Sequence, residues 1–208
     1  MSRFGNMSSK LFSSIREFHI EGDTDTLADE LTSVCNKMVS LTDKVAGFRR
    51  ILITYSDTNN SPQYQKACDS SAAFLQNLYN QLDELTELQS TAIRFIDKVN
   101  EFNDMPPCGR APVTFDRQSV DIQTSSSRMT MIKEEMEEVK RAIWELVDEA
   151  RNACQSLSSS ASSLESIWRD EQYDRFCDFI EEIMVSIQRS VSDLEDYYTY
   201  LNNKINSL

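Results

Sequence analysis

Few side chains in this 208-residue chain have the type and spacing that catalysis or metal binding requires. His19 is the only histidine, and it has no evident partner for acid–base or nucleophilic chemistry. Glu134, Glu135, Glu137 and Glu138 form a dense carboxylate cluster, but it lacks the Glu-x-x-His pattern of helical di-metal sites. The glycines are isolated, so no phosphate-binding loop is evident. We therefore expect no catalytic residue, no metal site and no cofactor, and we expect that the protein is not an enzyme.

The remaining reactive side chains are five cysteines, Cys35, Cys68, Cys108, Cys154 and Cys177. No two form a Cys-x-x-Cys pair, and their odd number and wide spacing are typical of thiols in a reducing compartment. Cys154 and Cys177 lie at nearly equal distances from a bend expected near residue 166. A disulfide between these two is therefore an alternative to free thiols, although disulfide geometry is demanding.

Aromatic residues gather at this bend, between two helical stretches. Trp168 comes just before a helix start that Asp170 can cap, and Tyr173 and Phe176 are three positions apart on one helix face. Trp168 could close the end of a helical hairpin, with its N–H reaching a nearby carbonyl oxygen. It could also be an exposed anchor for a partner's groove, since tryptophan is favoured at interface hot spots. The sequence leaves both roles open.

The spacing of apolar residues predicts the helices that position the bend. Apolar positions recur in steps of three and four, which buries one side of a helix and leaves the other in water. We expect helices at about residues 25–55, 62–102, 127–163 and 170–208, the third capped by the serines at 125–127. The four apolar stripes are Leu27, Leu31, Val34, Met38, Leu41, Val45, Phe48 and Leu52; Tyr64, Cys68, Ser71, Leu75, Leu78, Leu82, Leu85, Ala92, Ile96 and Val99; Met129, Ile132, Met136, Val139, Ile143, Leu146, Ala150, Ala153 and Leu157; and Phe176, Ile180, Ile183, Ile187, Val191, Leu194, Tyr198, Leu201 and Ile205.

The expected fold class is all-α, with two long helical hairpins in tandem. They could pack as an antiparallel four-helix bundle or extend as a coiled coil, within one chain or swapped between chains. Residues 1–24 are expected to be a flexible arm, 25–102 the first hairpin, 103–126 a linker and 127–208 the second hairpin. Three of the four prolines lie in the linker, which could also be a crossover strapped along the helices.

The second hairpin resembles the WXG superfamily, small helical hairpins that bacterial type VII secretion systems export. The resemblance covers about residues 127–207. Within it, the motif at the bend is similar to a Trp-x-Asp-x-Gln-x-x-x-Phe variant in WXG-like proteins of anaerobic bacteria. It implies a hairpin that pairs with a second hairpin, so that a tandem chain would be a fused form of the family's antiparallel dimers. The residues that carry it are Trp168, Asp170, Gln172 and Phe176, with Tyr198, Tyr200, Leu201 and Ile205 downstream.

The chain departs from the family at two positions. Asp170 replaces the family's glycine, so a capped helix start must make the bend. The family's export signal is a tyrosine followed four residues later by Asp or Glu, and Tyr198 is followed by Asn202. Export through a type VII system is therefore not supported by this signal.

Charge and hydropathy narrow the choice of partner. The net charge of −13 disfavours nucleic acid, because phosphate binding needs clustered Lys and Arg, and also disfavours anionic membranes. No segment reaches the ~20 apolar residues of a membrane span. The first twenty residues are basic and amphipathic without the continuous apolar run of a Sec signal peptide, and transient membrane or partner contact is one interpretation of them.

The leading hypothesis is a non-enzymatic helical-hairpin protein of a type VII-like secretion system. It would be made in the cytoplasm and secreted without a Sec signal, as a substrate or as the targeting partner of a larger secreted protein or secretion component. A homodimer is a further arrangement, and an intracellular coiled-coil adaptor or scaffold is the alternative function. The expected partner-binding residues, acting through helix–helix pairing, are Trp168, Asp170, Tyr173, Phe176, Tyr198 and Leu201.

Overall fold

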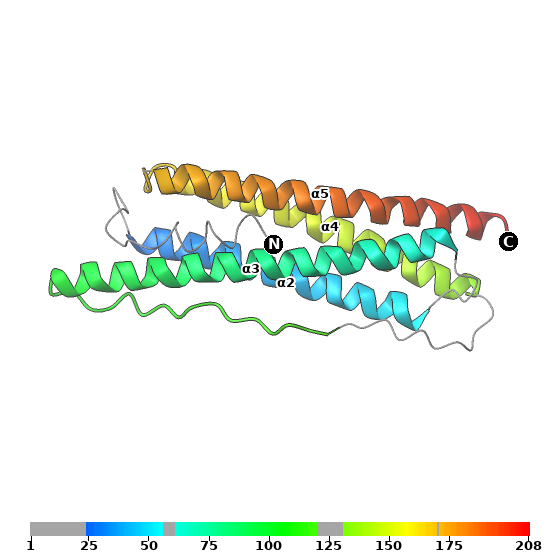
Figure 1. Ribbon diagram of the computed structural model, residues 1–208, viewed down its shortest axis with the longest axis horizontal. Coiled ribbons are helices and arrows are strands. Elements are labelled where there is room, and N and C mark those ends of the chain that lie inside the picture. Colours follow the sequence, from blue (N-terminus) through cyan, green and yellow to red (C-terminus); the bar gives the residue numbers. More distant parts are fainter. Residues whose placement is uncertain (1–23, 56–60, 120–130, 170) are drawn as a thin grey trace. The chain divides into compact units, whose positions relative to one another are not determined.

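A computed structural model describes residues 24–55, 61–119, 131–169 and 171–208 of the chain. Within these ranges the chain folds into helices packed against one another, and no β-strand occurs in them (Figure 1). The expected all-α class is therefore confirmed. The helices are α2 (Thr24–Thr54), α3 (Pro62–Phe102), α4 (Lys133–Leu164) and α5 (Glu171–Asn206).

Local sequence signals account for most of the helix ends. α3 begins at Pro62, where the missing N–H costs no hydrogen bond, and Ser61 Oγ accepts a bond from Tyr64 N at 3.1 Å. α5 has acidic residues in its first turn and Lys204 in its last, which suits the helix dipole. Asp170, the expected cap of α5, lies outside the described residues. The predicted ends of α2 and α3 agree with the structure to within two residues.

The predicted start of α4 is too early. The helix begins at Lys133, and the expected serine caps lie outside the described residues. Glu135 Oε2 accepts a hydrogen bond from Ile132 N at 3.1 Å, a carboxylate reaching back three residues to the position before the helix. This is the second half of a capping box, and it sets the start of the helix at Lys133 without a serine.

The apolar stripes form the core with few exceptions. All eight stripe residues expected in α2 are buried. In α3 Val99 is only half-buried, and Ile132, expected in the α4 stripe, is 57% exposed and precedes the helix. In α5 Tyr197 is buried whereas Tyr198 is half-buried, so the predicted stripe was one residue off at this turn. The 3.6-residue period of a straight helix explains such drift from a strict heptad.

The chain divides into two compact units, and each contains segments of all four helices. The first unit comprises Met1–Val39, Asn80–Phe115 and Gln155–Ile183, and the second comprises Ser40–Tyr79, Asp116–Cys154 and Met184–Leu208. Residues from both halves of the sequence therefore share each unit. Each hairpin expected from the sequence consists of two whole helices. The division into these two compact units instead cuts across every helix.

Polar contacts in the second unit join the two halves of the sequence. Lys66 on α3 bonds to Asp193 at 2.9 Å and to Asp196 at 3.0 Å, both on α5. Tyr55 directly follows the end of α2, and its hydroxyl donates to Glu138 of α4 at 2.7 Å. In this unit, segments of α2 and α3 therefore contact segments of α4 and α5 directly.

After α3 the chain leaves the helical path and turns back along that helix (Figure 1). We call residues 103–119 the strap. Met105 N donates to the Asn100 carbonyl at 2.8 Å, and Asp104 adopts a φ of 54°, so the end of α3 closes in a left-handed turn. The described part of the predicted linker therefore follows the crossover alternative.

Candidate functional site

The bend between α4 and α5 is closed by a buried tryptophan. The backbone N–H groups of Ile167 and Trp168 both donate to the Leu164 carbonyl, at 3.0 and 2.8 Å. Trp168 has no exposed surface. The centroid of its ring lies 5.6 Å from that of the Phe176 ring and 6.1 Å from that of the Tyr173 ring. Such tilted aromatic pairs add to the stabilisation from burial. Of the two roles that the sequence left open, this geometry favours Trp168 as the plug that closes the hairpin.

Tyr173 ties the start of α5 to the end of α4. Its hydroxyl donates to the Ala161 carbonyl at 3.0 Å, across the bend. Burial raises the pKa of this hydroxyl well above its usual value, and the neighbouring Cys177 thiol adds to the shift. Tyr173 therefore keeps its proton in the neutral range and remains a hydrogen-bond donor.

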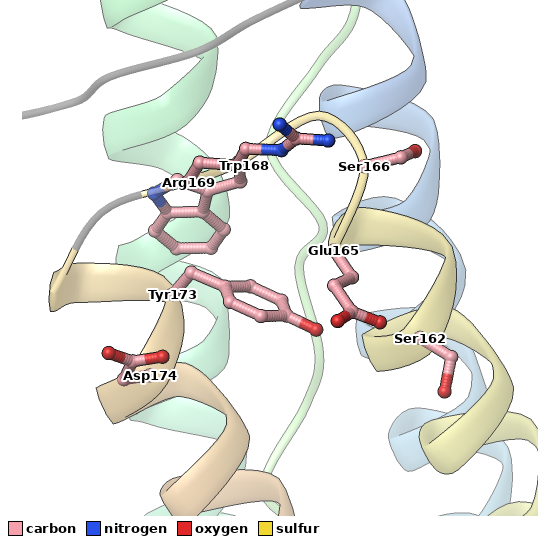
Figure 2. A pocket seen from close by; sticks show the side chains of 7 residues that line it. All are labelled: Ser162, Glu165, Ser166, Trp168, Arg169, Tyr173 and Asp174. Atoms are coloured by element: carbon pink, nitrogen blue, oxygen red, sulfur yellow. The ribbon is translucent and has the colours of Figure 1, made fainter.

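A pocket of about 630 Å³ opens beside this bend. Figure 2 shows Tyr173 pointing from α5 toward Glu165, which follows the end of α4. The serine hydroxyls of the pocket are hydrogen-bonded to helix carbonyls, for example Ser162 Oγ to the Ser158 carbonyl at 3.0 Å. The residues that line the pocket are Ser162, Glu165, Ser166, Trp168, Arg169, Tyr173 and Asp174.

The lining of this pocket is polar and charged. It offers two carboxylates, a guanidinium and three hydroxyl groups, and the Cys177 thiol neighbours one of these hydroxyls, that of Tyr173. No group of three potential metal ligands occurs in the described ranges. The arrangement can hold a small polar or charged group by hydrogen bonds and charge.

The predicted partner-binding residues are distributed over both units. Trp168, Tyr173 and Phe176 belong to the first unit, where Trp168 and Phe176 are buried and Tyr173 is half-buried. Tyr198 and Leu201 belong to the second unit, where Leu201 is 1% exposed. The buried members hold the fold together and are not available to a partner.

Tyr198 keeps part of its ring accessible. Lys140 Nζ of α4 lies 5.9 Å from the centre of this ring, within range of a cation–π interaction. Lys140 also bonds to Glu137 at 2.8 Å. Tyr198 therefore contributes mainly to the contact between α4 and α5 in the second unit.

The sequence interpretation missed Trp144. This side chain is 61% exposed on α4, in the second unit. It comes one position after the core residue Ile143, so the helical period turns it toward water. A tryptophan off the apolar stripe was the signal that could have identified it, because large exposed aromatics are candidate contacts for partners.

All five cysteines are free thiols, so the alternative disulfide between Cys154 and Cys177 is not formed. Burial raises the pKa of Cys35 to about 12 and also raises the pKa values of Cys68 and Cys154. Thiols shifted in this direction are poor nucleophiles at neutral pH. Cys35 and Cys68 are buried and act as small apolar groups of the core.

No helix in the described ranges is long and apolar enough to cross a membrane. Comparisons with protein-family models, curated proteins and solved structures find no match to this chain. The fold and the site thus define an all-helical protein with a tryptophan-closed bend, and the functional conclusion depends on the contacts described above.

Proposed function

We propose that this protein is a non-enzymatic helical-hairpin protein of a bacterial type VII-like secretion system, acting as a secreted substrate or targeting partner. The observation that carries the proposal is that the hairpin with the tryptophan bend meets the other hairpin of the same chain. In the second unit the Tyr64 ring of α3 packs edge-on against the Tyr197 ring of α5, with centroids 6.4 Å apart. The ion pairs of Lys66 with α5 lie beside this aromatic contact.

The proposal interprets α2 and α3 as a built-in partner. WXG-like hairpins pair through their apolar stripes, and here α2 and α3 would take the place of a second chain. The completed unit would be an antiparallel four-helix bundle. Burial of both stripes supports this interpretation, because a lone hairpin would leave apolar surface in water.

An export assay tests the proposal, with the signal position as its variable. The tagged chain is expressed in a bacterium that carries a type VII system, with and without the secretion ATPase, and the culture medium is assayed. Asn202→Asp creates the missing acid four residues after Tyr198, and we expect it to increase ATPase-dependent export. Asn203→Asp adds the same charge at the wrong spacing and serves as the matched control.

Retention of all forms in the cell, or release into the medium that does not depend on the secretion ATPase, would contradict the secretion role. Equal ATPase-dependent export of both variants would contradict only the assignment of the signal to position 202. The Asn202 substitution is structurally mild, because Lys140 Nζ lies 3.4 Å from Asn202 Oδ1 and would pair with an acid there. A difference between the two variants would therefore report recognition of the signal and not a change of fold.

An intracellular adaptor is the second candidate, and exposed Trp144 favours it. An adaptor needs an accessible contact on an otherwise complete fold, and this side chain is placed to provide one. Capture of partners from the source cells by wild-type and Trp144→Ala chains tests the role. Val185→Ala, which truncates another half-exposed apolar residue of the second unit, is the control. Loss of a cytoplasmic partner with the Trp144 variant alone would support the adaptor.

A further inference from the structure

The strap is fastened to α2 by an arginine fork within the first unit. Arg110 Nε donates to Asp29 Oδ1 at 2.7 Å, and its Nη2 donates to Asp29 Oδ2 at 2.9 Å. The remaining Nη1 donates to Asp25 Oδ1 at 2.9 Å. Paired bonds of this geometry recognise an arginine specifically, because a lysine could not make them in parallel.

Side chains of α3 bind the strap backbone in the same unit. Gln89 Oε1 accepts from Val113 N at 2.8 Å, while its Nε2 donates to Thr32 Oγ1 at 2.8 Å. Gln89 is fully buried, so these two bonds fix the direction in which its oxygen points. Further along α3, Asp97 Oδ1 accepts from Cys108 N at 2.9 Å. The helices thus present fixed acceptors to the N–H groups of an extended chain.

The strap itself buries very little. None of its residues from 103 to 119 is buried, and Val113 and Phe115 are only half-buried. Its attachment depends on hydrogen bonds and ion pairs near the surface, which contribute little individually. The helices thus present a set of polar acceptors to an occupant that buries little apolar surface.

We propose that the face of α2 and α3 that carries Asp25, Asp29, Gln89 and Asp97 is a binding site for an extended, arginine-containing peptide. In this structure the strap occupies this site. The partner is a segment with an arginine for the fork and, three residues later, a free N–H for Gln89. The inference goes beyond the proposed function, which concerns helix pairing, and does not depend on it.

The strap also indicates what precedes the arginine in such a peptide. Gly109 has a φ of 70°, a conformation that side chains disfavour, although a Cβ there would meet nothing within 4 Å. Glycine is therefore required by the backbone and not by lack of space. Pro112 restricts Ala111 to an extended conformation, which positions Val113 opposite Gln89. The recognised pattern is Gly-Arg-x-Pro-x.

Competition from the strap sets the condition for binding. A segment tethered to its own site has an effective concentration on the order of millimolar. A separate peptide therefore binds when the strap is released or when its parent protein makes additional contacts. This condition makes the proposal testable with a chain whose strap is weakened.

The test uses the full-length chain with Arg110→Ala and Val113→Pro, which remove the fork and the N–H donor. A fluorescent peptide with the wild-type sequence of residues 104–119 is titrated and followed by anisotropy. We expect saturable binding to this variant at least tenfold tighter than to the wild-type chain. A peptide with alanine at position 110, or the further change Asp29→Asn in the chain, should weaken binding about tenfold, as expected for loss of a charged paired bond.

Absence of binding to a variant with unchanged helical circular dichroism would overturn the proposal. Binding that is indifferent to the peptide arginine would overturn it as well. If the variant does not fold, hydrogen exchange of the Val113 amide in the wild-type chain tests whether the strap opens locally. We expect this amide to exchange by local opening at least a hundredfold faster than the core amides of α3, and exchange only at the rate of global unfolding would refute an exchangeable strap. Failure of the export assay would leave these outcomes unaffected.

Discussion

The bend and residues 103–115 of the strap both depart from the helical path in the first unit, but different forces hold them. At the bend Trp168 is fully buried and packs against the Tyr173 and Phe176 rings. In the strap no residue is buried, and the attachment consists of the Arg110 fork and bonds to side chains such as Gln89. Burial of an apolar side chain in the core is lost only when the core itself opens. Hydrogen bonds near the surface can instead be replaced by hydrogen bonds to water at a small cost in free energy. The bend is therefore a permanent part of the fold, and the strap is suited to opening.

The largest expected effect comes from Trp168→Ala, which tests the permanence of the bend. Removing a fully buried tryptophan leaves a cavity and should lower the free energy of unfolding by about 3–5 kcal/mol. Urea unfolding followed by circular dichroism measures it. Trp144→Ala is the matched control on the exposed face of α4, with an expected change within about 0.5 kcal/mol. Similar losses in the two variants would contradict the contrast between plug and surface.

Gln89→Ala tests the point where the strap meets the core, and we expect an intermediate effect. The substitution removes the acceptor of Val113 N and the donor to Thr32 Oγ1. Lost bonds of a buried amide should lower the free energy of unfolding by about 1–3 kcal/mol. The strap should also open, which proton exchange at Val113 would detect. Unchanged exchange at Val113 would show that Gln89 does not hold the strap.

The bend was more predictable from the sequence than the strap. Steps of three and four residues identify the stripes of α2 because helical periodicity is local, and a tryptophan just before an expected helix start identifies the bend. The partners Arg110 and Asp29 are 81 positions apart. No local pattern links residues so distant, and the prolines of the strap indicate only the absence of a helix.

Two other features show the same limit. The start of α4 was misplaced because a carboxylate from Glu135 replaces the expected serine cap. Trp144 lies between stripe positions, so the helical pattern gives it no role in the core and does not single it out. The rings of Trp168, Tyr173 and Phe176 do lie close together, but whether Trp168 faces the core or the solvent depends on the side chains packed around it. That packing is set by tertiary contacts.

Tyr173→Phe gives a finer test of the bend. The hydroxyl bond to the Ala161 carbonyl is lost while the ring next to Trp168 stays. We expect a decrease of about 0.5–1.5 kcal/mol in the free energy of unfolding, the usual contribution of one hydrogen bond. Tyr198→Phe is the control, with a ring that is also half-buried but belongs to the second unit. An equal or larger loss in the control would remove the special role of Tyr173.

The smallest expected effect is that of Asp29→Asn on the strap, and it should depend on pH and salt. Arg110 holds the pKa of the Asp29 carboxyl below the ordinary value of 3.8, chiefly through its hydrogen bonds. Because the pKa is lowered on folding, the fork stabilises the strap above pH 3.8 and loses this contribution as the pH falls through the folded pKa. In wild type the Arg110 Nε–H resonance should shift with a midpoint below 3.8, and exchange at Val113 should increase with salt. In the Asp29→Asn chain both dependences should be much weaker, with global stability nearly unchanged. The informative quantity is the protection factor of the Val113 amide, the ratio of its intrinsic to its observed exchange rate. A protection factor unchanged by low pH, by salt and by the substitution would mean that the fork does not fasten the strap. The distinction between a permanent bend and an exchangeable strap would then rest on burial alone.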